Sequence, residues 1–296
     1  MASAPLELYD ELTCRNRGFV PPASQQRLRK ATVLVAGCGS TGGAVVAPLA
    51  RLGVEGFVLA DNGTYELNNL NRQDAALKDI GRNKAAVCAR NVAAINPQAR
   101  IRVETEGVRR GNAHALVAAC DVVIDGVDVT EPAGWRAKYA LHEAAAGLRR
   151  PVISGYDMAG TQYVRFYDYR RPAAPFDGVI TPSQVGAGRT WALLRRVVPL
   201  RVVPVEMLES ARRSVATGEE SVSQLVYTSM LFGALASRMV IDVLDGRPVR
   251  RHTVVDVHRQ VRPRRSALFS GARKPWVVAL ALRDLALLER GTGHRR

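Results

Sequence analysis

The stretch ATVLVAGCGSTGG, residues 31–43, decides the fold of this chain. A short apolar run breaks into a cluster of glycines and resumes at residues 44–47, which predicts a buried strand, a tight turn and a helix start. Gly37, Gly39 and Gly42 have the G-x-G-x-x-G spacing, at which the backbone turns sharply, approaches a phosphate and packs the helix onto the strand. The N–H groups and dipole of such a helix start bind a phosphate. Glycine clusters also close ordinary turns, so the residues that follow decide.

Length and composition predict a globular protein. The 296 residues, 47% of them hydrophobic, suffice for one large domain or two small ones with a sizeable core. No apolar run reaches the length of a membrane span, and the N-terminus carries acidic residues where a signal peptide carries basic ones. We therefore expect a soluble, cytoplasmic protein without membrane association. The four cysteines are widely spaced without a C-x-x-C pair, which argues against a zinc site and a disulfide framework.

The formal net charge of +15 is compatible with nucleic acid, anionic lipid or a polyphosphate substrate. The arginines responsible are spread along the chain and become dense only toward the C-terminus. No aromatic residue interleaves with the basic run at 259–265, so a solvated basic surface is a better interpretation than a base-stacking platform. We do not expect nucleic acid to be the partner.

Apolar runs that alternate with helical patterns predict an α/β fold with a doubly wound, Rossmann-like, mostly parallel sheet. Residues 161–169 alternate between apolar and polar, which predicts a half-exposed strand in an antiparallel extension. After the first strand and its helix, which runs to about residue 51, we expect strands at 57–60, 99–105, 121–126 and 151–155, and helices at 83–95, 112–119 and 135–146.

The two ends of the chain and one internal stretch interrupt this alternation. Prolines and the lack of apolar periodicity predict an N-terminal arm with little core contact. Residues 170–190 are rich in proline and glycine and predict a long crossover loop. A largely apolar helix at 221–244 is expected in the core or at a subunit interface, and a strand at 252–259 and a helix at 275–288 follow it. The expected segments are an arm at 1–30, a nucleotide-binding Rossmann-like domain at 31–168, the crossover loop, interface helix and sheet extension of the same domain at 169–265, and a basic C-terminal helix and tail at 266–296.

Acidic residues mark the ends of two expected strands. Asp61 lies 22 positions after Gly39, where a dinucleotide-type fold places the acid that binds a ribose, although it also suits a turn cap. Asp125 and Asp128 follow the fourth strand. Because ligands bind outside the carboxyl ends of parallel strands, the glycine loop, Asp61 and Asp128 are expected to open onto one crevice. Asp125 is the weaker candidate, since it suits a cap of the next turn.

The decisive feature is a series of motifs in one order. After the glycine loop and Asp61 come NLNRQ at 69–73, IGRNK at 80–84, INP at 95–97 and DGVD at 125–128. Over about residues 15–262, the series resembles the ThiF/MoeB/HesA group of the ubiquitin-activating-enzyme superfamily. The NLNRQ block is absent from the dehydrogenase fingerprint, so the resemblance is specific.

The resemblance implies ATP-dependent adenylation of a carboxylate, often the C-terminus of a peptide or small protein, to give acyl-AMP and pyrophosphate. The chemistry agrees, because this step needs alignment and charge neutralisation more than covalent catalysis. Arg72 and Lys84 are then phosphate ligands, Asn69 and Gln73 position phosphate or ribose oxygens, and Asp128 holds Mg²⁺. Taken singly, Arg72 or Lys84 is better interpreted as a plain surface charge on so basic a protein.

The resemblance also implies a homodimer in which an arginine of the arm reaches the partner's phosphates. Arg15 and Arg17 lie near that place, and Arg17 is the preferred candidate. The chain departs from the group at Ser40, where a second adjacent glycine is usual, and at Gly63, where relatives often have another acid; the Ser40 hydroxyl suits donation to a phosphate. No cysteine follows Cys120, so we expect no enzyme thioester, and the acyl adenylate is released or used directly.

Two other functions use the same motifs. An NAD-dependent oxidoreductase uses the glycine loop and Asp61 but leaves Arg72, Lys84 and Asp128 unexplained. A non-catalytic partner subunit keeps the fold and lends an arginine to a catalytic relative. The sequence does not name the acyl substrate, and a carrier protein, a peptide or a small carboxylic acid all remain open.

Overall fold

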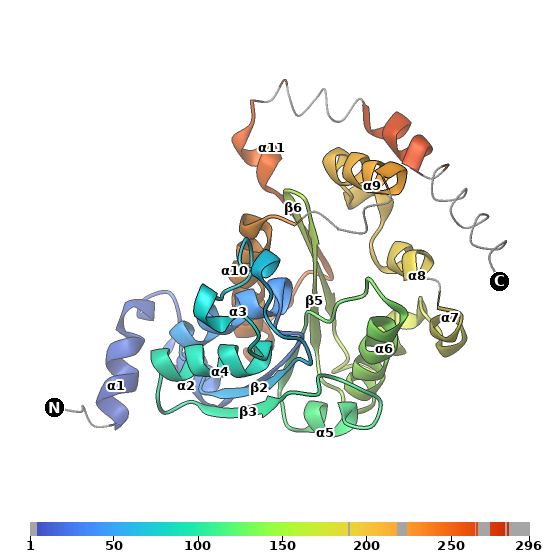
Figure 1. Ribbon diagram of the computed structural model, residues 1–296. Helices are drawn as coiled ribbons and strands as arrows, with labels where there is room; N and C mark the ends of the chain where they lie inside the picture. Colours follow the sequence, from blue (N-terminus) through green and yellow to red (C-terminus); the bar gives the residue numbers. More distant parts are fainter. Residues whose placement is uncertain are drawn as a thin grey trace.

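The protein is described from a computed structural model that covers residues 5–188, 190–217, 224–263, 265, 273–281 and 283. Its centre is a seven-stranded sheet in the order β3-β2-β1-β4-β5-β6-β7 (Figure 1). The first five of these strands are parallel, and the last two run antiparallel to their neighbours. The strands are β1 (Thr32–Ala36), β2 (Gly56–Ala60), β3 (Arg100–Glu104), β4 (Val122–Asp125), β5 (Val152–Met158), β6 (Thr161–Tyr167) and β7 (His252–Asp256).

Strand order confirms the predicted doubly wound sheet and places its switch point. From β1 the chain moves outward through β2 to β3, then returns to β4 on the other side of β1. The connections after β1 and β4 therefore leave the sheet in opposite directions, and a crevice opens beyond their carboxyl ends. The glycine loop and the DGVD motif follow these two strands directly, so the fold brings them to the same place.

Helices cover both faces of the sheet, as Figure 1 shows. One face carries α3 (Ser40–Leu52), α4 (Lys84–Ile95) and α10 (Val226–Leu244), and the other carries α5 (Ala113–Ala118) and α6 (Pro132–Gly147). Local signals set several helix ends. Gly53, at φ 98°, ends α3 in the left-handed conformation, and the Asn83 side chain caps α4 by accepting the Ala86 N–H at 3.1 Å.

Two elements of the sheet extension differ from expectation. The prediction that β6 is half-exposed is wrong, because all seven residues are buried. Val164 and Phe166 pack in the core under α10, while Tyr163 and Tyr167 pack in the core on the α6 face. The last strand ends early because Asp256 caps a short helix, α11 (Val257–Val261), by accepting the Arg259 N–H at 2.9 Å.

The crossover after β6 contains short helices rather than one long irregular loop. Phe176, Ile180 and Val185 are buried against the core on the α6 face, which gives the segment an apolar anchor that its lack of periodicity hid. Farther on, Val205 and Leu208 pack against Val277 and Ala281 of the C-terminal helix. Residues 282 and 284–288 of that predicted helix lie outside the described residues, as does the tail. The crossover helices are η4 (Pro175–Gly178), α7 (Pro182–Gly186), α8 (Thr190–Val197), η5 (Leu200–Val202) and α9 (Val205–Thr217).

The N-terminal arm folds as α1 (Pro5–Leu12), η1 (Cys14–Asn16) and α2 (Pro22–Lys30). The expectation that it contributes little to the core is wrong. Tyr9 is 1% exposed and donates its hydroxyl to the carbonyl of Gly53 at 3.0 Å, and Leu28 is fully buried. Pro22 begins α2 rather than stopping a helix, because proline at the first helical position loses no hydrogen bond.

Helix α10 corrects the statement that no apolar run reaches the length of a membrane span. Its 19 residues are long and apolar enough by length and composition alone, but 56% of its most apolar window is buried. Its residues pack against α3 and the sheet, as in the core helix of a globular protein. The helix begins at Val226; residues 221–223 of the predicted helix lie outside the described residues.

Candidate functional site

The glycine loop is held in very close contact with the turn that follows β4. Gly37 has φ 83°, and a Cβ there would lie 2.4 Å from the carbonyl oxygen of Gly126. At Gly42 a Cβ would lie 1.9 Å from the carbonyl oxygen of Gly37, so no larger residue fits. These two positions need glycine for the tight turn and for helix packing, as the spacing predicts.

Gly39 has room for a side chain instead. A Cβ at this residue would meet nothing closer than the Gln73 side chain, whose Oε1 would be 3.7 Å away. Gly39 is also the N-cap of α3 and has no side chain with which to cap the first helical N–H groups. Gln73 is buried, and its Oε1 has no hydrogen-bond partner among the described residues. A helix start without a side-chain cap and a buried acceptor without a described partner thus lie next to each other, which fits a polar ligand such as a nucleotide.

Asp61, at the end of β2, holds the glycine loop. One carboxylate oxygen accepts the N–H of Cys38 at 2.6 Å, and the other accepts the N–H of Gly63 at 2.7 Å. Burial raises the pKa of Asp61, while these hydrogen bonds and the charge of Lys84 act in the opposite direction. The structure is therefore compatible with Asp61 as a ribose ligand and as a turn cap, because each carboxylate oxygen keeps a lone pair beyond its turn contact.

Lys84 is the first residue of α4 and lies near Asp61. Its ammonium group is 5.9 Å from the ring centre of Tyr65 and would lie 3.6 Å from a Cβ at Gly63. The same Cβ would lie 3.1 Å from an oxygen of Asp61, so an acid at position 63 would stand between the two side chains. Glycine at position 63 therefore leaves no side chain between Asp61 and Lys84 at this point.

The NLNRQ motif forms the loop around η2 (Leu67–Asn69), and η3 (Leu77–Asp79) follows it. Asn69 is buried, and its side chain orders the loop, accepting the Glu66 N–H at 3.3 Å and donating to Asn68 at 2.7 Å. Arg72 donates to the Asn68 carbonyl at 2.9 Å and to the side chain of Gln224, just before α10. Asn69 therefore shapes the loop that carries Arg72 and Gln73.

The charges of two carboxylates act on Arg72. Burial lowers the pKa of its guanidinium, while the charges of Asp157 and Asp128 raise it. Asp128 is exposed and accepts the N–H of Thr130 at 2.9 Å. Its charge also acts on Asp61, on which the charge of Lys84 acts as well, so these four side chains interact electrostatically.

Asp157, near the end of β5, is a site residue that the sequence motifs did not mark. Its Oδ2 accepts hydrogen bonds from Ser229 at 2.9 Å and Ser40 at 3.2 Å, and burial raises its pKa. The Ser40 hydroxyl is therefore already engaged with α10 and β5, rather than free for the phosphate donation suggested by its position. Only the strand-end location of Asp157 offered a signal.

The arm arginines are not near the crevice of their own chain. Arg15 and Arg17 are exposed, and Asn16 between them donates to the Leu52 carbonyl at 3.2 Å, at the last residue of α3. Because α3 begins at the glycine loop and is 13 residues long, about 20 Å separates these ends. Contact with phosphates in the same chain is excluded by this placement, while contact with a partner's phosphates is not.

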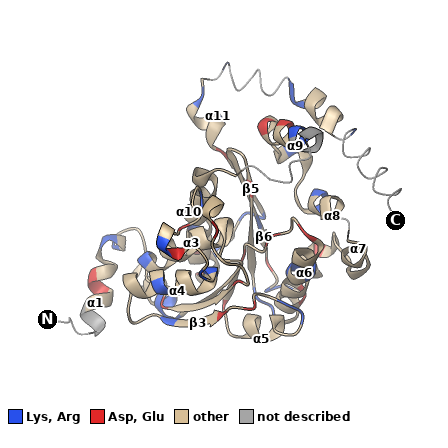
Figure 2. Ribbon diagram, in the orientation of Figure 1, with Lys and Arg blue, Asp and Glu red and all other residues tan. Residues whose placement is uncertain are grey.

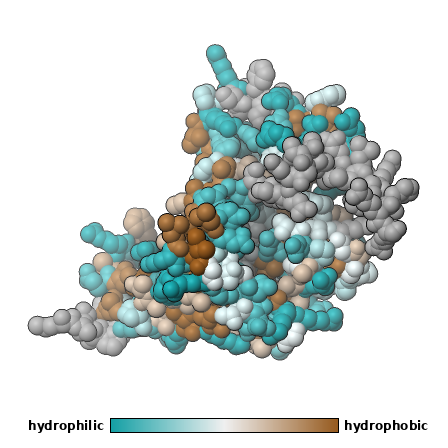
Figure 3. All heavy atoms as spheres, viewed as in Figure 1, coloured by the Kyte–Doolittle hydropathy of each residue, from teal (hydrophilic) through white to brown (hydrophobic). Residues whose placement is uncertain are grey.

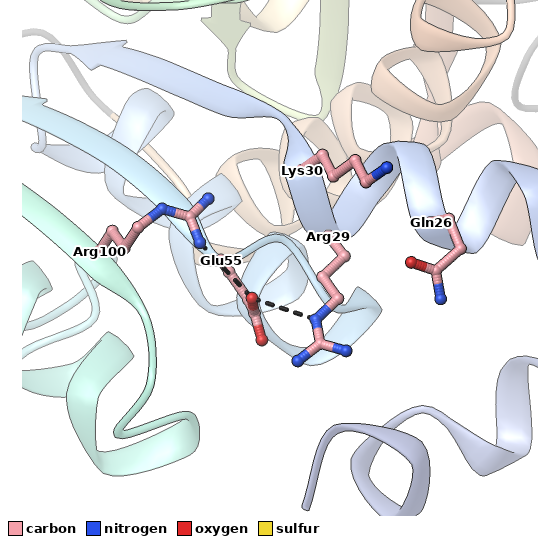
Figure 4. Close-up of a pocket in the computed structure, with 5 residues that line it drawn as sticks. All are labelled: Gln26, Arg29, Lys30, Glu55 and Arg100. Atoms are coloured by element: carbon pink, nitrogen blue, oxygen red, sulfur yellow. Dashed lines mark hydrogen bonds and ion pairs between the residues drawn. The ribbon is translucent and has the colours of Figure 1, made fainter. Parts of the chain in front are cut away.

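Another basic group lies at the amino ends of β2 and β3, away from the crevice. Figure 4 shows Arg29 and Arg100 on either side of Glu55, whose Oε2 they approach at 3.3 Å and 3.6 Å. Gln26 and Lys30 complete the lining of this surface depression. In Figure 2 lysine and arginine are spread over most elements, which matches a solvated basic surface better than one concentrated patch.

A magnesium ion fits this crevice only if substrate oxygens supply most of its ligands. Within the described ranges, no group of three or more His, Cys, Asp and Glu side chains is placed to hold a metal. Asp128 offers an exposed carboxylate whose charge acts on Asp61 and Arg72. One carboxylate with phosphate oxygens and water is a common way for proteins to bind Mg²⁺.

Comparisons with known proteins agree with this geometry. A family model described as the ThiF family matches residues 13–254. A sulfur carrier protein adenylyltransferase of Thermus thermophilus is 30% identical over 137 residues, which cover 46% of this chain and 49% of the relative. A probable adenylyltransferase/sulfurtransferase, MoeZ, of Mycobacterium tuberculosis is 32% identical over 132 residues, 44% of this chain and 32% of the relative. The chain thus spans half or less of these relatives.

Solved structures with the same fold include two E. coli proteins. The tRNA N6-threonylcarbamoyladenosine dehydratase TcdA aligns with a TM-score of 0.59 at 18% identity, over 82% of this chain and 98% of TcdA. MccB, solved with succinimide, aligns with a TM-score of 0.62 at 16% identity, over 83% of this chain and 70% of MccB. At these identities the alignments bear on the fold alone.

Proposed function

Because the chain belongs to the ThiF family, we propose that it catalyses ATP-dependent adenylation of a substrate carboxylate. One observation carries the proposal. The uncapped helix start at Gly39 lies next to Gln73 Oε1, which has no partner among the described residues, and the charges of Lys84 and Asp128 act on Asp61 at the end of β2. The charge of Asp128 also acts on Arg72. A dinucleotide site needs the first of these features but not the cations.

In this reaction a carboxylate oxygen attacks the α-phosphorus of ATP, the bond to the bridging oxygen breaks, and pyrophosphate leaves. The start of α3 binds phosphate oxygens through its free N–H groups. Lys84 and Arg72 neutralise the charge that develops on the leaving group, and Gln73 orients the nucleotide. Asp128 would hold Mg²⁺, which when bound supplies further charge stabilisation to the phosphates.

The adenylate is released or passed directly to another nucleophile. Three of the four cysteines are buried, and Cys14 is partly buried in the arm. Contact with the Cys88 thiol, together with burial, raises the pKa of Cys38 well above its ordinary value. Burial raises the pKa of Cys120 to about 12, so neither thiol is a thiolate at neutral pH. Neither Cys38 nor Cys120 is therefore suited to form a thioester.

A homodimer completes the site. The exposed apolar residues Leu225, Val226 and Met230 begin α10, and the loop that carries Leu67 lies beside them, since Arg72 hydrogen bonds with both Asn68 and Gln224. Figure 3 shows apolar surface gathered where Figure 1 labels α3 and α10. Pairing through this surface would cover it and bring an arm arginine, Arg17 by preference or Arg15, to the partner's phosphates. Light scattering should give a dimer; an active monomer would rule this out.

The substrate is a carrier protein, a peptide or a small carboxylic acid in a biosynthetic reaction. The names of two relatives, one acting on a sulfur carrier protein and the other a sulfurtransferase, support a carrier protein. We place the enzyme in the cytoplasm, where ATP is available. The segments at 1–30, 31–168, 169–265 and 266–296 then serve as arm, nucleotide-binding part, substrate-facing part and basic C-terminal part.

The test is ATP–pyrophosphate exchange, with a panel of C-terminal glycine peptides and small carboxylic acids as probes. Exchange that depends on both the acid and Mg²⁺ is expected from the pure protein. Exchange restored only by a related subunit would instead support a non-catalytic partner. The test variant is Lys84→Ala, which should slow pyrophosphate exchange. Its matched control is Lys78→Ala in η3, outside the charge cluster, which should catalyse exchange like the wild type.

A further inference from the structure

Behind the crevice lies a buried polar cluster centred on Asp125. The Asp125 carboxylate is fully buried, and its Oδ2 accepts hydrogen bonds from Lys138 Nζ at 2.6 Å, Ser154 Oγ at 2.6 Å and His142 Nε2 at 3.0 Å. Its Oδ1 accepts the N–H of Val127 at 3.3 Å. Lys138 and His142 come from α6 and are also buried. Four donors and full burial thus tie this carboxylate to its neighbours in the fold.

The hydrogen bonds in this cluster have a defined direction. Burial alone would raise the pKa of Asp125, but the charge of Lys138 and the hydrogen bond from His142 hold it well below its usual range. Burial lowers the pKa of His142, so a neutral ring donates from Nε2 and accepts at Nδ1. Tyr169 then donates its hydroxyl to Nδ1 at 2.8 Å, and its oxygen accepts the Phe176 N–H at 2.7 Å. We call the side chains of Asp125, His142 and Tyr169 the relay.

One end of the relay fixes the turn that carries Asp128. Asp125 bonds to the N–H of Val127 inside this turn. Gly126 packs so tightly that a Cβ there would lie 2.6 Å from the Gly42 nitrogen of the glycine loop. A shift of Asp125 would therefore move the turn that carries Asp128 and the contact of Gly126 with the glycine loop.

The other end fixes the start of the crossover segment. Phe176 and Asp177 have φ near 55°, a left-handed conformation that costs free energy in residues other than glycine. The Phe176 ring stacks on His142 with centroids 3.9 Å apart, and Asp177 pairs with Arg165 at 3.3 Å. These contacts hold the strained backbone. The segment then runs along α6 to Gly188, where a Cβ would lie 3.9 Å from Pro132, four residues after Asp128.

We propose that the relay is a positioning device that sets the Asp128 turn and the crossover segment together. The nucleotide side and the acyl side of the crevice are then aligned by one hydrogen-bonded chain. Stability alone is a poor reason for such a cluster, because buried ions cost desolvation free energy and apolar side chains of similar size often stabilise as well or better. The inference rests on the proposed function, since it takes the crevice to be the ATP site.

The test compares two tyrosine-to-phenylalanine variants that each lose one buried hydroxyl. Y169F breaks the link between His142 and Phe176. Y167F is the matched control, because Tyr167 lies beside Tyr169, with ring centroids 5.8 Å apart, and its hydroxyl is outside the relay. Hydrogen–deuterium exchange is measured over 126–131 and 172–180 in both. We expect Y169F to exchange at least tenfold faster in both segments, and Y167F to match the wild type. Faster exchange in 172–180 alone would overturn the coupling.

ATP affinity gives a second readout, because a merely structural role of the relay would weaken ATP binding equally with and without Mg²⁺. Calorimetric titration is run with Mg²⁺ and with EDTA. If the relay sets Asp128, Y169F weakens ATP binding at least fivefold with Mg²⁺ and less than twofold with EDTA, and Y167F changes neither. Equal weakening in both conditions contradicts the proposal. If the wild type binds no ATP, the proposed function fails. The hydrogen–deuterium exchange of Y169F and Y167F still decides whether the two segments are coupled.

Discussion

The crevice and the relay lie on opposite sides of one turn, and they differ in how their polar groups are exposed and hydrogen bonded. On the crevice side, Asp128 is exposed and the buried Oε1 of Gln73 has no partner among the described residues. On the relay side, Asp125, only three residues earlier, accepts four hydrogen bonds in full burial. Asp125 is therefore paired within the fold, while the Gln73 oxygen and the Asp128 carboxylate remain available to a ligand.

Two lysines give the largest contrast between these regions. Lys138→Met leaves the Asp125 charge buried without its cation, which should cost about 3–5 kcal/mol of the free energy of unfolding. Lys84→Met, in the crevice, should change stability by less than about 0.5 kcal/mol. Urea unfolding measures both. Equal losses of unfolding free energy in the two variants would contradict the distinction between the paired Lys138 and the crevice lysine Lys84.

Asp128 and Lys84 should dominate the rate. Asp128→Ala and Lys84→Ala each remove a charge that matters most in the transition state, so each should lower the exchange rate by about a hundredfold to a thousandfold, with a smaller effect on ATP affinity. Because both serve one triphosphate, the double variant should lose far less than the product of the two. Wild-type rates in both single variants would refute the site assignment.

Different residues of the N-terminal arm are expected to affect folding and the reaction. Tyr9→Phe loses the hydroxyl that bonds to the carbonyls of Gly53 and Gln25, which should cost about 1–2 kcal/mol in stability. Arg15 and Arg17 are exposed, so substitution of either by alanine should leave thermal unfolding unchanged while Arg17→Ala, the preferred candidate, slows exchange. A mixture of Arg17→Ala with Lys84→Ala should recover some activity, because mixed dimers keep one intact site. No recovery would argue against action across the dimer.

The smallest effect is a pH dependence away from both regions. The hydrogen bond from Arg90, at 2.7 Å, lowers the pKa of Asp79 to about 2. A depressed carboxylate pKa stabilises the fold above about pH 4 and loses this contribution as the pH falls toward 2. Because Arg90 is partly exposed, Asp79→Asn should cost only about 1 kcal/mol near neutral pH. The deficit should shrink below pH 4 in denaturant titrations; a constant deficit would contradict the assigned cause.

Local signals explain which parts of this molecule could be predicted from the sequence. The strands and helices between residues 31 and 155 obey apolar periodicity and caps such as Asn83, so the sequence predicted the sheet and the crevice that follow from them. The burial of β6 did not, because its covering elements are distant in sequence. Asp157 and the His142–Tyr169 contact join residues 27 to 117 positions apart, which no spacing records. Tyr9 likewise meets Gly53 across 44 positions.

Parallel calorimetric titrations of ATP with Mg²⁺ and of NAD⁺ test the central claim most directly. Both ligands would use the glycine loop, but only a triphosphate engages Lys84 and Asp128. The account predicts saturable ATP binding that Lys84→Ala weakens at least tenfold, and no saturation by NAD⁺ at micromolar concentration. Micromolar NAD⁺ binding together with a failure of ATP to bind would contradict it.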